Sequence, residues 1–231
     1  LMVGTLRNLS VCYLKLSLYD SAWYFIQEAD KLSSQTGDLL QTHAVLLSKA
    51  NILDQIGDLE ECLKIERQLL NIANRLGNSS LQLTSMINLG ASFSNRGSLD
   101  SSQLYYEQAE QLALELNDVY NLALVRNNLA NTYYEMNKVS EAIQMAYDVL
   151  DKAWTIDRKQ IVVSAASRLS IWLAMQGRID EAKEAESQGL RAVKSVDNLR
   201  TKAYMHESFF EANRLAGQYE TAIDLLLLSR S

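Results

Sequence analysis

Residues that end helices recur at a fixed interval along this chain. One series, whose members are spaced by 40 residues or a multiple of 40, consists of Gly57, Gly97, Asn137, Gly177 and Gly217. A second series lies midway between them and consists of Gly37, Gly77, Asn117, Asp157 and Asp197. Gly, Asn and Asp tolerate the left-handed backbone conformation that commonly follows a helix. The sequence therefore predicts a helix end about every 20 residues.

The segments between these residues have the apolar periodicity of helices. Residues 59–76 show it well, and no segment of the chain alternates strictly between apolar and polar residues, so strands are not expected. Asp38 with Gln41, and Asp58 with Glu61, have the spacing of a capping box and indicate where two of the helices begin. Each segment provides about 17 helical residues, a length of roughly 25 Å.

Two successive helices form a hairpin, which is too thin to bury both of its faces and must stack on its neighbours. We therefore predict an all-α fold, an α-solenoid of about six antiparallel helix hairpins that forms one repeat domain over residues 1–231. The expected repeats are 1–37, 38–77, 78–117, 118–157, 158–197 and 198–231. Because the chain opens inside a helical pattern, we also expect it to be a fragment of a longer protein.

Small residues occupy two fixed places around the turns. The place five residues after each turn holds Ala22, Cys62, Ser102, Ala142, Ala182 and Ala222. The place seven residues before it holds Ser10, Ala50, Gly90, Ala130 and Ser170, with Phe210 in the last unit. Small side chains are needed where two helices cross closely, so these places predict the crossing points of the hairpins.

This order of features resembles the tetratricopeptide repeat (TPR). "NLGASFSNRGSLDSSQLYYEQA" (88–109) and "NLANTYYEMNKVSEAIQMA" (128–146) carry the resemblance best, and it extends over essentially the whole chain. The family's usual repeat has about 34 residues, whereas this one has 40, as in the longer repeats of bacterial peptide-sensing regulators and helical sensor segments. The resemblance implies a right-handed superhelix whose first helices line a concave groove.

The groove implied by the resemblance is rich in asparagine. An asparagine amide offers both a donor and an acceptor, which suits the backbone of an extended peptide. Asn127, Asn131 and Tyr134 have i, i+4, i+7 spacing and share one helical face. The expected ligand-binding residues are Asn51, Asn88, Asn95, Asn127, Asn128, Asn131, Tyr134 and Arg168. The alternative, that asparagines only solvate an exposed helical face, stays open at this point.

A clamp for a partner's C-terminal carboxylate, known in some repeats of the family, is incomplete here. Asn128, Asn131 and Arg168 stand at plausible places. The places where lysines would be needed hold Ser164 and either Ile87 or Asn127. Arg168 could still pair with one acidic group of a ligand.

Several other classes of function are disfavoured. His43 and His206 lie four hairpins apart without metal-ligand spacing, and there is no glycine-rich phosphate loop or GxSxG motif, so we expect no catalysis, no metal and no cofactor. We expect both histidines at the surface or at its boundary. The net charge is −6 and no Lys/Arg cluster occurs, which disfavours nucleic acid as a partner of this segment.

Membrane insertion and secretion are also disfavoured. No stretch reaches the roughly 20 apolar residues that span a membrane, and the first residues do not have the pattern of a signal peptide. Cys12 and Cys62 lie in no recognisable motif, so we expect them to be small buried residues. A cytoplasmic location is expected.

The last helix carries four leucines in a row, at 225–228, which would cover every side of it. A terminal solenoid helix usually has a polar outer face, so we expect further chain to follow or a homodimer to form there.

Taken together, the sequence features favour a non-enzymatic domain that binds a peptide or protein segment as the sensor or scaffold of a larger regulator. The alternative is a self-association module with no peptide ligand.

Overall fold

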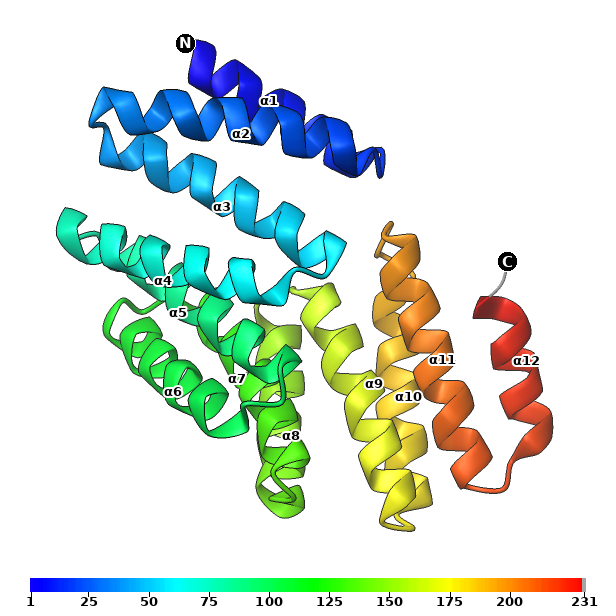
Figure 1. Ribbon diagram of the computed structural model, residues 1–231. Coiled ribbons are helices and arrows are strands. Elements are labelled where there is room, and N and C mark those ends of the chain that lie inside the picture. The colour runs from blue at the N-terminus through cyan, green and yellow to red at the C-terminus, as the bar shows by residue number, and fades with distance from the viewer. Residues whose placement is uncertain (230–231) are drawn as a thin grey trace. The chain divides into compact units, whose positions relative to one another are not determined.

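The structure, a computed structural model, describes residues 1–229, without the side chains of Leu226, Leu228 and Ser229. Within that range the backbone forms α-helices and no strand, which confirms the all-α prediction (Figure 1). The helices are α1 (Met2–Lys15), α2 (Tyr19–Thr36), α3 (Leu39–Ile56), α4 (Leu59–Leu76), α5 (Ser79–Asn95), α6 (Leu99–Glu115), α7 (Val119–Glu135), α8 (Val139–Thr155), α9 (Lys159–Met175), α10 (Ile179–Val193), α11 (Leu199–Leu215) and α12 (Tyr219–Ser229).

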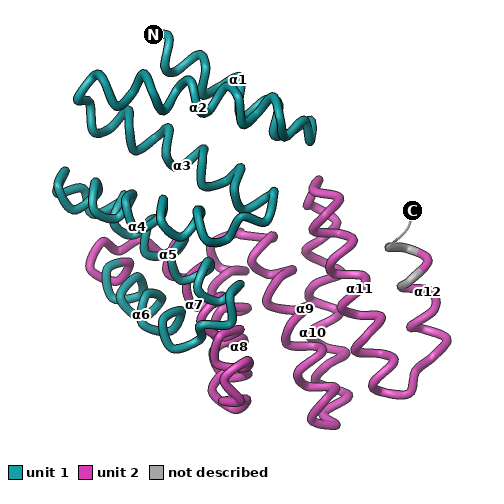
Figure 2. Tube along the Cα trace, viewed as in Figure 1, with its two compact units in different colours: residues 1–112 teal, residues 113–231 magenta. Residues whose placement is uncertain are grey.

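The helices belong to two compact units, Leu1–Leu112 and Ala113–Ser231, called unit 1 and unit 2 below (Figure 2). In unit 1, α1 packs on α2, α3 packs on α4, and α3 also contacts both α1 and α2. In unit 2 the hairpin partners are α7 with α8, α9 with α10, and α11 with α12. The first helices of these hairpins also meet, because α9 contacts both α7 and α11. Helix α9 is therefore the central element of unit 2.

Left-handed residues end the helices as the sequence predicts. Every predicted residue except Asp197 has a positive φ, and Asn137, for example, has a φ of 63°. The next amide, that of Lys138, donates a 2.8 Å hydrogen bond back to the carbonyl of Tyr133, which closes the turn in the manner of a Schellman motif. Ser17, which lies 20 residues before Gly37 and was not predicted, has a φ of 57°.

The prediction at Asp197 is wrong. Helix α10 ends at Val193, and its C-cap residue Lys194 keeps a right-handed conformation. The amide of Val196 then bonds to the carbonyl of Val193 at 3.0 Å. Both valines are buried in the core of unit 2. Burial of Val196 requires a loop here, so the chain leaves the helix earlier than the 20-residue spacing suggests.

The predicted helix starts at Asp38 and Asp58 are confirmed. Asp38 accepts a hydrogen bond from the amide of Gln41, and Asp58 accepts one from the amide of Glu61. Asn78, Asp118 and Asn198 cap α5, α7 and α11 in the same way. Helices α8, α9 and α10 differ, because they follow Lys138, Arg158 and Arg178 and have no side-chain cap.

The predicted small residues lie where helices cross closely. A methyl group on Gly90 of α5 would lie 2.6 Å from the ring of Tyr106 on α6, and that ring is only 2% exposed. Ala50, Cys62, Ala142 and Ala182 are likewise buried. At the other end of the chain Leu225 is buried and Leu227 is exposed, while the remaining two leucine side chains of that run lie outside the described residues.

Candidate functional site

The polar face of α9 organises the candidate site in unit 2. Gln160, Ser164 and Arg168 recur at i, i+4 and i+8 and therefore lie on one side of this helix. All three are outside the buried core, whereas most of the neighbouring α9 side chains belong to it. Since α9 contacts α7 and α11, this polar row stands beside both neighbouring first helices.

Asn127 of α7 is joined to α9 by two hydrogen bonds. Its amide nitrogen donates to the Ser164 hydroxyl at 3.2 Å, and its main-chain oxygen accepts from Nη1 of Arg168 at 2.9 Å. The residue is only 5% exposed. Its side chain is thus buried against α9 rather than fully open to a ligand, and the bond to Arg168 uses one of that guanidinium's five donors.

Tyr134 also packs on α9. Its ring is stacked on that of Trp172, with 4.6 Å between the centroids, and its hydroxyl donates to the sulfur of Met175 at 2.9 Å. Burial raises the pKa of this phenol above its ordinary value. On the same helix, Asn131 is half-buried and its amide nitrogen donates to Glu135 at 2.7 Å, while Asn128 is half-buried.

The structure thus brings the predicted residues of unit 2 together at the α7–α9 contact and gives several of them internal partners. The predicted residues of unit 1 lie on other helices. Asn51 is exposed on α3, Asn88 is half-buried on α5, and Asn95 is exposed at the end of α5. Among the described residues, none of these three side chains has a hydrogen-bonding partner.

A hollow between α9 and α11 was not predicted. It has a volume of about 300 Å³ and is lined by Gln160, Ser164, Asn198, Arg200, Thr201 and Tyr204; it is called the Arg200 hollow below. Gln160 and Arg200 are 40 residues apart, as are Ser164 and Tyr204, so the same places of two successive repeats face each other. The 40-residue repeat could have identified these residues, because it places Arg200 and Tyr204 of α11 at the positions that Gln160 and Ser164 occupy in α9.

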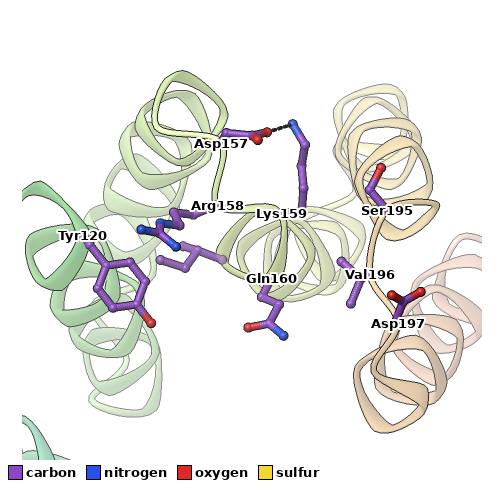
Figure 3. Close-up of a pocket in the computed structure, with 9 residues that line it drawn as sticks. Tyr120, Asp157, Arg158, Lys159, Gln160, Ser195, Val196 and Asp197 are labelled. Carbon is purple, nitrogen blue, oxygen red and sulfur yellow. Dashed lines mark ion pairs between the residues drawn. The ribbon is translucent and has the colours of Figure 1, made fainter.

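A larger hollow adjoins the first at Gln160. It has a volume of about 490 Å³, and its lining residues are Tyr120, Asp157, Arg158, Lys159, Gln160, Ile161, Ser195, Val196 and Asp197; it is called the Tyr120 hollow below (Figure 3). The guanidinium of Arg158 lies over the Tyr120 ring, 4.7 Å from its centroid, and Lys159 pairs with Asp157 at 2.7 Å. Since Gln160 lines both hollows, they form one continuous surface.

Two expectations about titratable residues outside these hollows are wrong. His43 is 3% exposed, which corrects the expectation of a surface or boundary position, and burial lowers its pKa. Cys12 is exposed, contrary to the expectation that both cysteines are buried.

No cluster of three potential metal ligands occurs within the described part of the chain. None of the described helices has both the length and the apolar character needed to cross a membrane.

Comparison with known proteins identifies the repeat. Residues 122–153, which cover most of α7 and α8, match the family model described as tetratricopeptide repeat. No curated protein matches the chain in sequence.

Similar solved structures share the fold. A STAND signal transduction ATPase with a tetratricopeptide repeat sensor, from Pyrococcus horikoshii, is 15% identical with a TM-score of 0.81; the alignment covers 99% of this chain and only 36% of that protein. A Rap conjugation gene regulator of the plasmid pLS20, solved in complex with a Phr peptide, is 13% identical with a TM-score of 0.73, over 96% of this chain and 71% of the regulator.

A third similar structure has repeats of the same type. It is a putative kinesin light chain from Podosopora anserina with nearly identical TPR-like repeats, 16% identical with a TM-score of 0.68, and the alignment covers 85% of this chain and 97% of the other. Identities this low establish the fold alone. Together with the family match, they show that the helical hairpins of this chain are of the tetratricopeptide type.

Proposed function

Because the chain is built of tetratricopeptide-type repeats, we propose that it is a non-enzymatic domain that binds an extended peptide or protein segment on the α7–α9–α11 face of unit 2. The observation that carries this proposal is the Arg200 hollow, which adjoins the Asn127–Ser164 hydrogen bond on one side and the Tyr120 hollow on the other. The three features form one continuous surface, with polar groups and apolar area, over the first helices of three successive hairpins.

The chemistry of this surface suits a polypeptide. An extended segment brings a donor and an acceptor with every residue, and each needs a partner when it leaves water. The Gln160 amide and the hydroxyls of Ser164, Thr201 and Tyr204 can each donate and accept. The Tyr204 ring, 41% exposed, adds apolar surface for a side chain of the ligand. The Rap regulator solved with a peptide supports this reading.

A role as the sensor or scaffold of a larger regulatory protein is part of the proposal. The STAND protein, in which the matched region represents about a third of the chain and whose repeats are described as a sensor, supports it. In such an arrangement the bound segment would shift the packing between neighbouring hairpins, and an attached module would respond to that shift.

The test uses a fluorescently labelled pool of degenerate peptides about eight residues long, roughly 27 Å when extended. Recognition through the peptide backbone tolerates many sequences, so such a pool is a suitable probe. Fluorescence anisotropy should show binding to the wild-type chain, and Gln160→Ala/Tyr204→Ala should weaken it at least about tenfold, or 1.4 kcal/mol.

The matched control is Gln176→Ala/Tyr24→Ala, which removes the same two side-chain types from exposed positions outside both hollows. It should bind as the wild type does. Equal affinity of the two double variants would overturn the proposed surface. Absence of binding to the wild type at a total peptide concentration on the order of 1 mM would overturn the proposed function.

Self-association is the second candidate, because an apolar row lies on α12. Tyr219, Ile223 and Leu227 have i, i+4, i+8 spacing and are 66%, 56% and 64% exposed. Sedimentation velocity at several concentrations tests this candidate. A dimer that Ile223→Glu dissociates would support it, whereas a monomer at every concentration would remove it.

A further inference from the structure

We propose that the Arg200 hollow selects ligands that carry a carboxylate, and that Arg200 is the residue that binds this group. The inference rests on the proposed function and deepens it, because it states which chemistry the bound segment must bring. The carboxylate is that of an Asp or Glu side chain or of the C-terminus of the segment, and the test below distinguishes the two.

Arg200 is the one charged residue that lines this hollow. It lies in the first turn of α11, is exposed, and has no carboxylate partner among the described residues. Other arginines of unit 2 are paired: Arg178 binds Glu181 through two hydrogen bonds of 2.7 Å, and Arg214 binds Glu211 in the same bidentate way. The chain has 28 acidic and 22 basic residues, so carboxylates are not scarce.

Two more arginines beside Gln160 and Ser164 lack a carboxylate partner within the described part of the chain. Arg158 is placed over the ring of Tyr120, and Arg168 bonds to the carbonyl of Asn127. Positive charge is thus gathered at the start of α9 and along its polar row, and among the described residues only Arg158 has a nearby counter-charge, that of Asp157. Such a surface attracts an anionic ligand and discriminates against a cationic one.

The two hollows differ in their acidic residues, and this difference assigns the carboxylate to the Arg200 hollow. The Tyr120 hollow contains Asp157, which Lys159 neutralises, and Asp197, on the wall opposite Arg158 (Figure 3). Asp197 would repel an anion placed there. No Asp or Glu lines the Arg200 hollow, so an anion that enters it meets the guanidinium and uncharged side chains, and no like charge from the lining.

The neutral groups complete the recognition of a carboxylate. A guanidinium binds a carboxylate through two parallel N–H···O bonds, and hydroxyl groups can donate to the oxygen lone pairs that remain. Thr201, Tyr204 and Ser164 place hydroxyls around the hollow, and Gln160 adds an amide N–H donor. The volume of about 300 Å³ is at the lower end of the range for ligand pockets, which suits a single acidic side chain or a chain end.

The test compares labelled degenerate peptide pools that differ at one fixed central residue. Three pools have amidated C-termini and carry Glu, Gln or Lys at that position, and a fourth carries Gln with a free C-terminal carboxylate. The wild-type chain should bind the Glu pool about two- to fivefold more tightly than the Gln pool, the effect of one ion pair at an exposed arginine. The free-carboxylate pool shows whether a chain end can replace the side chain.

Arg200→Gln should remove the advantage of the Glu pool over the amidated Gln pool, so that the ratio of the two affinities falls to about one. Arg200→Glu should reverse the preference in favour of the Lys pool. Lys202→Glu is the matched control, since it makes the same change of charge two residues further along α11 outside both hollows, and it should retain the preference for Glu. Thermal melts confirm that each variant is folded.

The outcomes separate this inference from the proposed function. If the wild type binds all four pools equally, peptide binding stands and carboxylate selection is overturned. If Lys202→Glu loses the preference as fully as Arg200→Glu does, the effect is one of general charge, and the assignment to Arg200 is wrong. If no pool binds to the wild type, the proposed function itself fails.

Discussion

Arg168 on α9 donates a 2.9 Å hydrogen bond from Nη1 to the main-chain oxygen of Asn127 on α7, a residue 41 positions earlier in the chain. The acceptor lies inside a helix, where a main-chain oxygen already receives the bond of its own turn, so this oxygen uses its second lone pair. The two first helices of neighbouring hairpins are thus fixed to each other at the polar face where we propose that the ligand binds.

Replacing Arg168 by Met should therefore destabilise unit 2. A hydrogen bond from a charged donor contributes roughly 1.5–3 kcal/mol, and methionine retains much of the apolar stem, so we expect a loss of about 2 kcal/mol in urea denaturation. Arg200→Met is the matched control and should leave the unfolding free energy within about 0.5 kcal/mol of the wild type. Equal stability of the two variants would contradict the structural role of Arg168.

The helix ends could be predicted from sequence because they depend on local backbone chemistry. Asn137 and Gly57 end their helices as their residue types suggest. Asp197 does not, because burial of Val196 is a tertiary requirement that residue type at the turn does not reveal. Ser17 shows the converse, since its place in the 20-residue register imposes a left-handed conformation that serine does not favour.

The site could be predicted only in part. The asparagine pattern pointed to α7, which borders the proposed surface, but spacing cannot tell whether an amide meets solvent or a neighbouring helix, and Asn127 is bonded to Ser164. Gln160, Arg200 and Tyr204 were missed because each is an ordinary surface residue in its own helix. Their proximity depends on how α9 packs against α11, which only the structure shows.

Gly90 provides a test of the close crossing between α5 and α6. In Gly90→Ala the added methyl would lie 2.6 Å from the buried Tyr106 ring, so the ring or the helices must shift, at a cost of about 1–3 kcal/mol. Gly4→Ala is the matched control, because the same substitution in α1 meets no atom within 4 Å. Alanine's better helix propensity should leave that variant as stable as the wild type, or more stable by about 0.5 kcal/mol. If urea denaturation shows that Gly90→Ala is more stable than Gly4→Ala, this packing is refuted.

The two cysteines should differ sharply in reactivity. Cys12 is exposed on α1, whereas Cys62 is buried, and burial raises the pKa of its thiol to about 12. Only the thiolate reacts with disulfide reagents. We expect the native protein to release one equivalent of thionitrobenzoate rapidly from Ellman's reagent, and Cys12→Ser to abolish this phase while Cys62→Ser retains it. Rapid reaction of both thiols in the folded protein would show that unit 1 opens around Cys62.

Glu66 makes the stability of unit 1 depend on pH. This carboxyl is 6% exposed in α4, and burial raises its pKa from 4.5 to about 7, although hydrogen bonds with Ser92 and Cys62 act in the opposite direction. Asp54 of α3 adds a repulsive charge. One carboxylate oxygen, Oε2, has no hydrogen-bonding partner, so the buried anion is poorly compensated, whereas the neutral acid is tolerated.

The sign of the effect follows from linkage. The folded state binds this proton more tightly than the unfolded chain, so the full stability is present below pH 4.5 and is lost as the pH rises through about 7. At roughly 1.4 kcal/mol per pKa unit, the loss from this group amounts to about 3 kcal/mol. The side chain of Glu66→Gln does not titrate, so this variant does not lose stability in this way. Its unfolding free energy should therefore rise relative to that of the wild type between pH 4.5 and about 7, and the difference should be constant at higher pH. Urea denaturation of both proteins across this pH range measures the difference, and the titration of all other groups cancels in it. A difference that does not vary with pH would show that Glu66 has the same pKa in the folded and unfolded states.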